Sequence, residues 1–187
     1  MQFKSLSKTL SLILLLFMLS CSRDDNCDLI LCQNGGECNE GICECPTGFF
    51  SSNCSQQIVP NYIRITKISL TRFSSTDENG EAWDIGSGPD IYVAMVYDND
   101  IIYEHPSPIQ NASPLQTHEF FPSSELRIEN PNDRYSFLLF DFDGPDPNTF
   151  MAGVEFSPYA STNKFPKTIT IDAGGDLAFE ISVEYVF

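Results

Sequence analysis

The sequence predicts an all-β protein, in which a small disulfide-rich module is followed by an antiparallel, eight-stranded β-sandwich. Three observations lead to this fold class. Six of the seven cysteines lie between Cys27 and Cys54, and the chain contains no cysteine after Cys54. From Tyr62 onward, short apolar or alternating segments recur between turn residues, which include 10 prolines and 7 glycines. No window shows the apolar stripe at helical spacing that an amphipathic helix requires.

Residues 1–20 have the composition of an export signal. Lys4 and Lys8 form a basic start, and Leu10–Leu19 form an apolar stretch, which at about ten residues is too short for a membrane-spanning helix. The following Ser20-Cys21 resembles the lipobox of bacterial lipoproteins. That resemblance implies a lipoprotein signal peptide over 1–20, lipidation of Cys21 and a lipidated tether over 21–26. The alternative is an ordinary secretory signal followed by an unrelated cysteine.

The lipobox resemblance implies a protein anchored in the bacterial outer membrane through the lipid on Cys21. Asp24-Asp25 resembles the short acidic tag of lipoproteins that are exported to the cell surface. Loss of residues 1–20 removes two lysines and no acid, so the formal charge changes from −16 to −18. Because such a surface repels polyanions, we expect no nucleic-acid partner.

The first module contains cysteines with the spacing C-x4-C-x5-C-x4-C-x-C-x8-C. In an exported chain, an even set of closely spaced cysteines predicts a disulfide framework, although six cysteines allow fifteen connectivities. The segments CQNGGEC (32–38) and CECPTGF (43–49), with the closing Cys54, resemble an EGF-like domain over 27–54. That resemblance implies the bridges Cys27–Cys38, Cys32–Cys43 and Cys45–Cys54. The aromatic residue that calcium-binding EGF-like domains place between the third and fourth cysteines is missing, so we expect a spacer or a small interaction unit.

The second module begins after a short polar linker over 55–61. The alternation of YIRITKISL is typical of a half-buried strand, and the continuous run IYVAMVY is typical of a central one. The predicted strands are Tyr62–Leu70, Ile91–Tyr97, Ile101–Tyr103, His118–Phe121, Leu126–Ile128, Tyr135–Phe140, Val154–Phe156, Thr168–Ile171 and Leu177–Val186.

Two acidic loops flank these strands. In WDIGSGPDIYV, Asp84 and Asp90 lie six residues apart around two glycines, immediately before a predicted strand. In FDFDGPDPNT, Asp141 and Asp143 follow a predicted strand, and Asp146 comes three residues later. In an extended D-x-D both side chains lie on the same side of the chain. Carboxylates placed this way repel each other unless a hard cation binds them, and calcium prefers oxygen ligands. Ordinary turn chemistry is the alternative explanation for these acids.

The two loops and the strands beside them resemble the calcium-binding end of a C2 domain, and the resemblance extends over 62–187. It implies Ca²⁺ as the cofactor and Asp84, Asp90, Asp141 and Asp143 as ligands, with Asp146 as the best match to a fifth acid. Ile91 stands where that family usually has proline, and the lysine-rich strand of phosphoinositide-binding C2 domains is missing.

We therefore expect a calcium-binding protein of the cell envelope, with a role in adhesion or recognition of an extracellular protein or glycan. A calcium-independent β-sandwich that binds carbohydrate or protein, with the EGF-like module as its spacer, is the alternative. We expect no catalytic activity, because no serine lies in a nucleophile motif or beside an evident base. His105 and His118 are interpreted as surface residues rather than zinc ligands.

Overall fold

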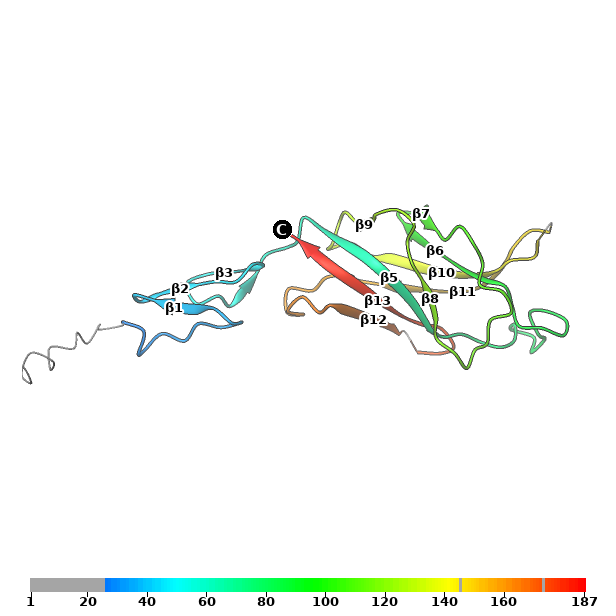
Figure 1. Cartoon of the computed structure of the whole chain (residues 1–187), viewed down its shortest axis with the longest axis horizontal. Helices are drawn as coiled ribbons and strands as arrows, with labels where there is room; N and C mark the ends of the chain where they lie inside the picture. The colour runs from blue at the N-terminus through cyan, green and yellow to red at the C-terminus, as the bar shows by residue number, and fades with distance from the viewer. Residues whose placement is uncertain (1–25, 145, 173) are drawn as a thin grey trace, which may run out of the picture.

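The computed structural model describes residues 26–144, 146–172 and 174–187. Within these residues every regular element is a strand, and the strands form antiparallel sheets (Figure 1), which confirms the all-β fold class. The predicted signal peptide over 1–20, the predicted lipidation site Cys21 and nearly all of the predicted tether over 21–26 lie outside the described residues. In the part that is described, no helix has the length and hydrophobicity needed to cross a membrane.

The small module consists of two short hairpins stapled by disulfides. Strand β1 (Glu37–Asn39) pairs with β2 (Ile42–Glu44), and β3 (Phe49–Phe50) pairs with β4 (Gln56–Gln57). Its disulfides are Cys27–Cys38, Cys32–Cys43 and Cys45–Cys54, the same pairing that the EGF-like resemblance implies. A unit of this size buries too little apolar surface to fold without such bridges. Because β4 falls inside the predicted linker over 55–61, part of that segment belongs to the module.

The sandwich consists of two antiparallel sheets. One sheet has the order β11-β10-β6-β7; the other has the order β12-β13-β5-β8, and β9 also pairs with β5. Strands β8 and β9 pair with successive halves of β5 and thus share one strand position, so the sandwich has eight positions as predicted. Strand β11 begins five residues earlier than the sequence predicts. The strands are β5 (Tyr62–Arg72), β6 (Ile91–Tyr97), β7 (Asp100–Glu104), β8 (His118–Phe120), β9 (Leu126–Ile128), β10 (Tyr135–Asp141), β11 (Thr149–Phe156), β12 (Thr168–Asp172) and β13 (Ala178–Val186).

The core lies between the two sheets and is built by strand alternation. On β10, Tyr135, Phe137 and Leu139 point into the core, and the residues between them are more exposed. The ring of Phe137 stacks on Phe156 of its own sheet at 5.3 Å and packs against Phe179 of the opposite sheet at 5.2 Å. Each buried aromatic side chain of this kind contributes roughly 1.5–3 kcal/mol through removal of apolar surface from water. This packing holds β10 between its own sheet and the opposite one.

The contact between the small module and the sandwich centres on one aromatic side chain, Phe165. The Phe165 ring meets Phe49 of β3 at 5.3 Å and Phe187 at 5.0 Å. Gly48 lies directly against both sandwich rings, and a Cβ at this position would come within 2.7 Å of atoms of Phe165 and Phe187. Only glycine allows this approach. The loops that precede β6 and follow β10 lie at the opposite end of the sandwich (Figure 1).

Candidate metal centre

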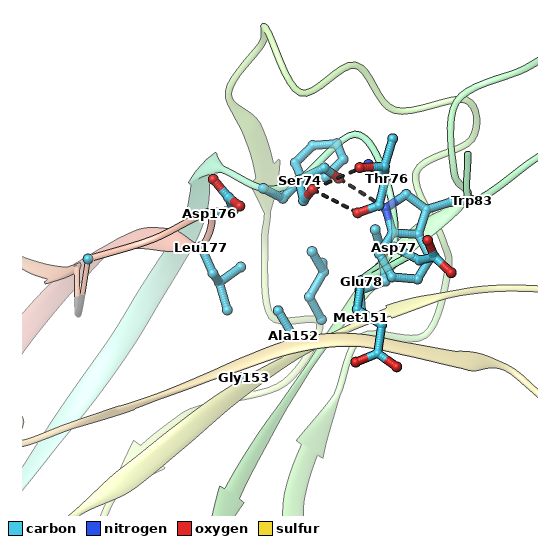
Figure 2. A pocket seen from close by; sticks show the side chains of 13 residues that line it. Ser74, Thr76, Asp77, Glu78, Trp83, Met151, Ala152, Gly153, Asp176 and Leu177 are labelled. Carbon is cyan, nitrogen blue, oxygen red and sulfur yellow. Dashed lines mark hydrogen bonds between the residues drawn. The ribbon is translucent and has the colours of Figure 1, made fainter. Parts of the chain in front are cut away.

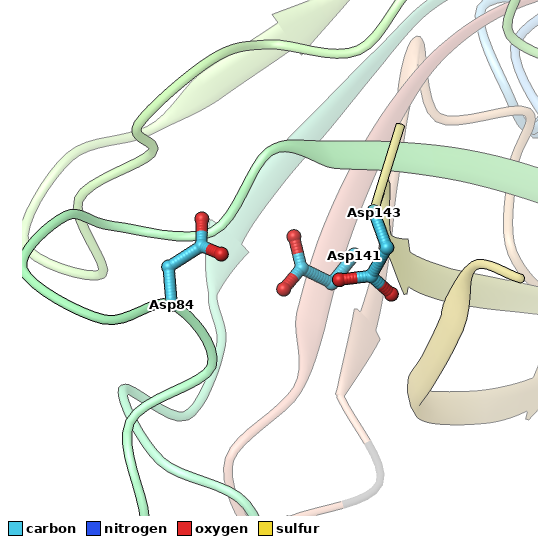
Figure 3. Close-up of side chains that lie close together, drawn as sticks. All are labelled: Asp84, Asp141 and Asp143. Carbon is cyan, nitrogen blue, oxygen red and sulfur yellow. The ribbon is translucent and has the colours of Figure 1, made fainter. Parts of the chain in front are cut away.

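Three aspartate side chains from two loops converge at the end of the sandwich far from the small module. Asp84 reaches from the loop before β6 toward Asp141, the last residue of β10, and toward Asp143 just beyond it (Figure 3). Each residue offers a carboxylate oxygen, and the three oxygens lie within 4.8 Å of one another. This is the only such group of histidine, cysteine or acidic side chains among the described residues.

Asp141 is the most constrained member of the group. The alternation that buries Phe137 and Leu139 also turns Asp141 toward the core, and Asp141 is only 1 % exposed. Its Oδ1 accepts a hydrogen bond of 2.8 Å from the backbone N–H of Asp90. Burial raises the pKa of the Asp141 carboxyl; the N–H of Asp90 opposes this rise, whereas the nearby charges of Asp84, Asp143 and Asp90 add to it.

The other two acids are half-buried and have weaker anchors. The hydroxyl of Thr149, at the start of β11, donates to Oδ2 of Asp143 at 2.8 Å. The hydroxyl of Ser87 donates to Oδ2 of Asp84 at 3.4 Å. Among the described residues no lysine, arginine or histidine forms an ion pair with Asp84, Asp141 or Asp143. Their formal charge of about −3 is therefore not balanced by the protein's own side chains.

Asp90 is placed differently from the prediction. Its carboxylate accepts the backbone N–H of Asn111 at 2.8 Å, and its own N–H holds Asp141. Gly88 explains this close packing, because a Cβ there would lie 2.3 Å from the carbonyl oxygen of Ala112. Asp90 thus joins three loops at this end, and it is not a member of the group of converging carboxylates.

Asp146 also lies outside the group. It is exposed, and its backbone N–H donates to the carbonyl oxygen of Asp143 at 3.4 Å, which is a turn contact. The amide of the neighbouring Asn148 donates to the hydroxyl of Tyr92 at 2.9 Å and ties this loop to β6. The sequence pattern did not indicate the roles of Thr149 and Asn148, although both follow directly in the acidic segment.

The two histidines make backbone contacts rather than a metal site. Nδ1 of His105 is hydrogen-bonded to the carbonyl oxygen of Ser107 at 2.8 Å, and Nε2 of His118 donates to that of Ser113 at 2.8 Å. The expectation that both are surface residues is wrong for His118, which is 9 % exposed and packs beside Phe73. As an alternating strand position of β8, it faces the core.

The chemistry of the converging group suits a hard cation. All its donors are carboxylate oxygens, which favour Ca²⁺ or Mg²⁺ over metals that prefer nitrogen or sulfur. The three carboxylates supply at most six oxygens, and three of these already accept hydrogen bonds from Asp90, Ser87 and Thr149. Calcium accepts variable numbers of protein and water oxygens, so it tolerates this partial set better than magnesium, which demands near-ideal octahedral geometry.

Comparison with known proteins found similar folds. No family model matches the chain, and no curated protein matches it. Solved structures that match include "Structure of a C2 domain", with 14 % identity and a TM-score of 0.43 over 65 % of this chain and 96 % of the other. A C2 domain protein from Ramazzottius varieornatus matches with 11 % identity and a TM-score of 0.43, over 69 % of this chain and 91 % of the other.

A third structure, which contains two C2 domains of Extended-Synaptotagmin 2, matches with 17 % identity and a TM-score of 0.41, over 75 % of this chain and 47 % of the other. At such TM-scores the likeness carries no argument of its own. The description of the second module as an antiparallel β-sandwich rests on the strand order and pairing of its two sheets.

Proposed function

We propose that the sandwich binds Ca²⁺ through Asp84, Asp141 and Asp143, and that the bound ion supports adhesion or recognition outside the cell. The observation that carries the proposal is the position of Asp141. A carboxylate that is 1 % exposed lies within 4.8 Å of two further acids, and none of the three has a basic partner among the described residues.

A cation at this point offsets two costs at once. Burial of an ionised carboxylate is unfavourable without a compensating charge, and three carboxylates at short distance repel one another. A divalent ion removes both penalties and links the loop before β6 to the loop after β10. The ion would therefore order the end of the sandwich that lies farthest from the small module (Figure 1).

The remaining parts of the chain fit a surface-anchored role. In this proposal residues 1–20 are removed, a lipid on Cys21 holds the protein in the bacterial outer membrane, and the EGF-like module keeps the calcium end away from the bilayer. The contact between Phe49 and Phe165 supports a spacer that holds a defined direction. The partner would be an extracellular protein or glycan, and no catalytic step is assigned.

The test is a thermal melt of the mature chain in EDTA and in millimolar calcium. Calcium should raise the melting temperature, and Asp143→Asn should remove most of that increase. The chain has one tryptophan, Trp83, directly before Asp84, so a calcium titration followed by tryptophan fluorescence gives an independent readout. An unchanged melting temperature at millimolar calcium would reject the metal proposal.

The calcium-independent alternative has one supporting observation. A groove of about 550 Å³ lies where the small module meets the sandwich, lined by the rings of Phe165 and Phe187 and by the hydroxyl residues Thr66, Thr168 and Ser182. Aromatic faces beside hydroxyl groups are suited to sugar rings. If this groove is the main binding site, glycan binding should be the same in EDTA and in calcium and should fall in Phe187→Ala.

A further inference from the structure

A separate cavity of about 360 Å³ opens at the same end of the sandwich (Figure 2). The segment over 73–83 lies on one side of it, the residues just before β13 lie on the other, and β11 passes beneath. None of the three converging aspartates lines it. The lining residues are Phe73, Ser74, Thr76, Asp77, Glu78, Trp83, Leu139, Met151, Ala152, Gly153, Gly174, Asp176 and Leu177.

The inner wall of the cavity is apolar and well fixed. Leu139 and Leu177 belong to the core, with exposed fractions of 0 % and 6 %. Strand register pairs Leu139 with Ala152 and Phe140 with Phe150, so Met151 is the extra residue of a β-bulge beside the cavity. The wall can therefore receive an apolar stem without rearrangement of the sheet.

Trp83 forms part of the wall in a defined orientation. Its Nε1–H donates to the carbonyl oxygen of Ser74 at 3.0 Å, and the hydroxyl of Ser74 donates to the carbonyl oxygen of Thr76 at 2.7 Å. Because the indole N–H already donates to Ser74, a ligand in the cavity can contact Trp83 only through the π surface of its ring. Such a surface attracts cations, and tryptophan does so more strongly than phenylalanine or tyrosine.

The rim carries acids and no base. Asp176 lies on one side and Asp77 with Glu78 on the other (Figure 2), and no lysine or arginine is among the lining residues. The backbone N–H of Glu81, followed by the side-chain amide and backbone N–H of Asn79, donates to Asp77 and lowers its pKa, which keeps it charged.

The nearest base in the sequence does not neutralise this rim. Arg72 pairs with Asp172 at 2.7 Å. Within the described residues, Glu78 and Asp176 form neither an ion pair nor a side-chain hydrogen bond. Two rim carboxylates therefore remain available to a ligand.

We propose that this cavity binds an arginine or lysine side chain of a partner protein. The alkyl stem would lie against the apolar wall, and the charged end would meet the indole of Trp83 and the carboxylates of Glu78 and Asp176. A long apolar stem with a cationic end is the shape and charge that these walls complement. The strongly acidic chain also favours approach of a basic partner. None of the carboxylates of the proposed calcium centre lines this site.

The test uses the single tryptophan as a local reporter. The mature chain in EDTA is titrated with Nα-acetyl-arginine amide or Nα-acetyl-lysine amide at constant ionic strength, and Trp83 fluorescence is recorded. The neutral analogue Nα-acetyl-citrulline amide has nearly the same shape as the arginine probe without its charge. A saturable change is expected with the cationic probes, and little or none with citrulline.

Matched variants locate the binding. Glu78→Gln and Asp176→Asn together should weaken binding of the arginine probe about three- to tenfold, in keeping with the loss of two partly exposed charge contacts. Glu180→Gln removes an exposed acid on β13 outside the cavity and should leave the affinity unchanged. Circular dichroism confirms that each variant is folded.

Three results would overturn the proposal. These are no saturable change with either cationic probe, equal binding of citrulline and arginine, and undiminished binding by the double variant. Tighter binding of choline than of arginine would assign the cavity to a lipid headgroup instead of a protein side chain. Because the titration is done in EDTA, its outcome is separate from the success or failure of the calcium proposal.

Discussion

Replacement of Asp141 by asparagine should make the calcium-free protein more stable than the wild type, and the calcium-loaded protein less stable than the wild type. Asparagine has nearly the same shape and keeps an oxygen that accepts the N–H of Asp90, but it removes the buried charge. At a separation of 4.8 Å, two unit charges repel by about 1 kcal/mol in water and about 3.5 kcal/mol at an effective dielectric constant near 20. Since Asp84 and Asp143 are partly exposed and screened by salt, the lower value applies.

In EDTA, Asp141→Asn removes two such repulsions, with Asp84 and Asp143, and weakens the charge-assisted hydrogen bond from Asp90 by about 1 kcal/mol. The variant should therefore be more stable than the wild type by about 1 kcal/mol, or about 3 °C in melting temperature for a chain of this size. In calcium the order should change. Calcium at a hundred times its dissociation constant stabilises the wild type by about 2.7 kcal/mol, or about 8 °C. The variant lacks the most buried ligand and should show only a small part of this increase.

Thermal and urea unfolding in EDTA and in calcium measure both effects. Asp146→Asn is the matched control, because it removes an acid from the same loop that lies outside the converging group. This control should keep the full calcium effect. The reasoning fails if Asp141→Asn retains the wild-type response to calcium, or if it is less stable than the wild type in EDTA.

Three further predictions concern other residues. Because burial raises the pKa of Asp141, the folded chain holds this proton more tightly than the unfolded chain. As pH rises from the ordinary aspartate pKa to the raised one, the calcium-free wild type should therefore lose stability relative to Asp141→Asn. Urea unfolding of both proteins in EDTA across this pH range tests the prediction. A difference in their free energies of unfolding that does not change with pH would contradict it. Phe165→Ala should destabilise the sandwich by about 2 kcal/mol, which is less than the usual cost of Phe→Ala at a fully buried site because Phe165 is only half-buried. The same variant should be cleaved faster by protease within 55–61. Lys164→Ala, at the exposed neighbouring position, should change neither stability nor cleavage. The hydrogen bond to Asp133 raises the pKa of Tyr97 to about 12, so in Asp133→Asn an ultraviolet titration should show one tyrosine ionising closer to pH 10, and an unchanged titration would refute the role of this bond.

The strands could be predicted because their pattern is local. A residue's side of a strand follows from parity, so the alternation in 62–70 and the apolar run in 91–97 already contain the division between core and solvent. The same parity applies to Asp141, which lies just beyond the predicted strand and occupies the next core-facing position after Phe137 and Leu139. The early start of β11 was missed because the polar residues around Thr149 carry no strand pattern, and pairing with β10 defines that strand.

The candidate site could be predicted only in part. The six-residue spacing of Asp84 and Asp90 and the D-x-D of Asp141 and Asp143 indicated two acidic loops, and the structure brings three of these four side chains together. Asp90 instead binds the N–H of Asn111, which is 21 residues away in the sequence. No local pattern shows that contact.

Sequence by itself determined the alternation of the strands, the cysteine spacing and the excess of negative charge, because each depends on residues close together in the chain or on composition. Tertiary structure decided which carboxylates converge, how Phe165 holds the small module, and that Trp83 and Asp176 share one cavity. These features join loops that are far apart in the sequence. Their positions follow from the packing of the two sheets, which fixes where each strand ends and which loops meet there.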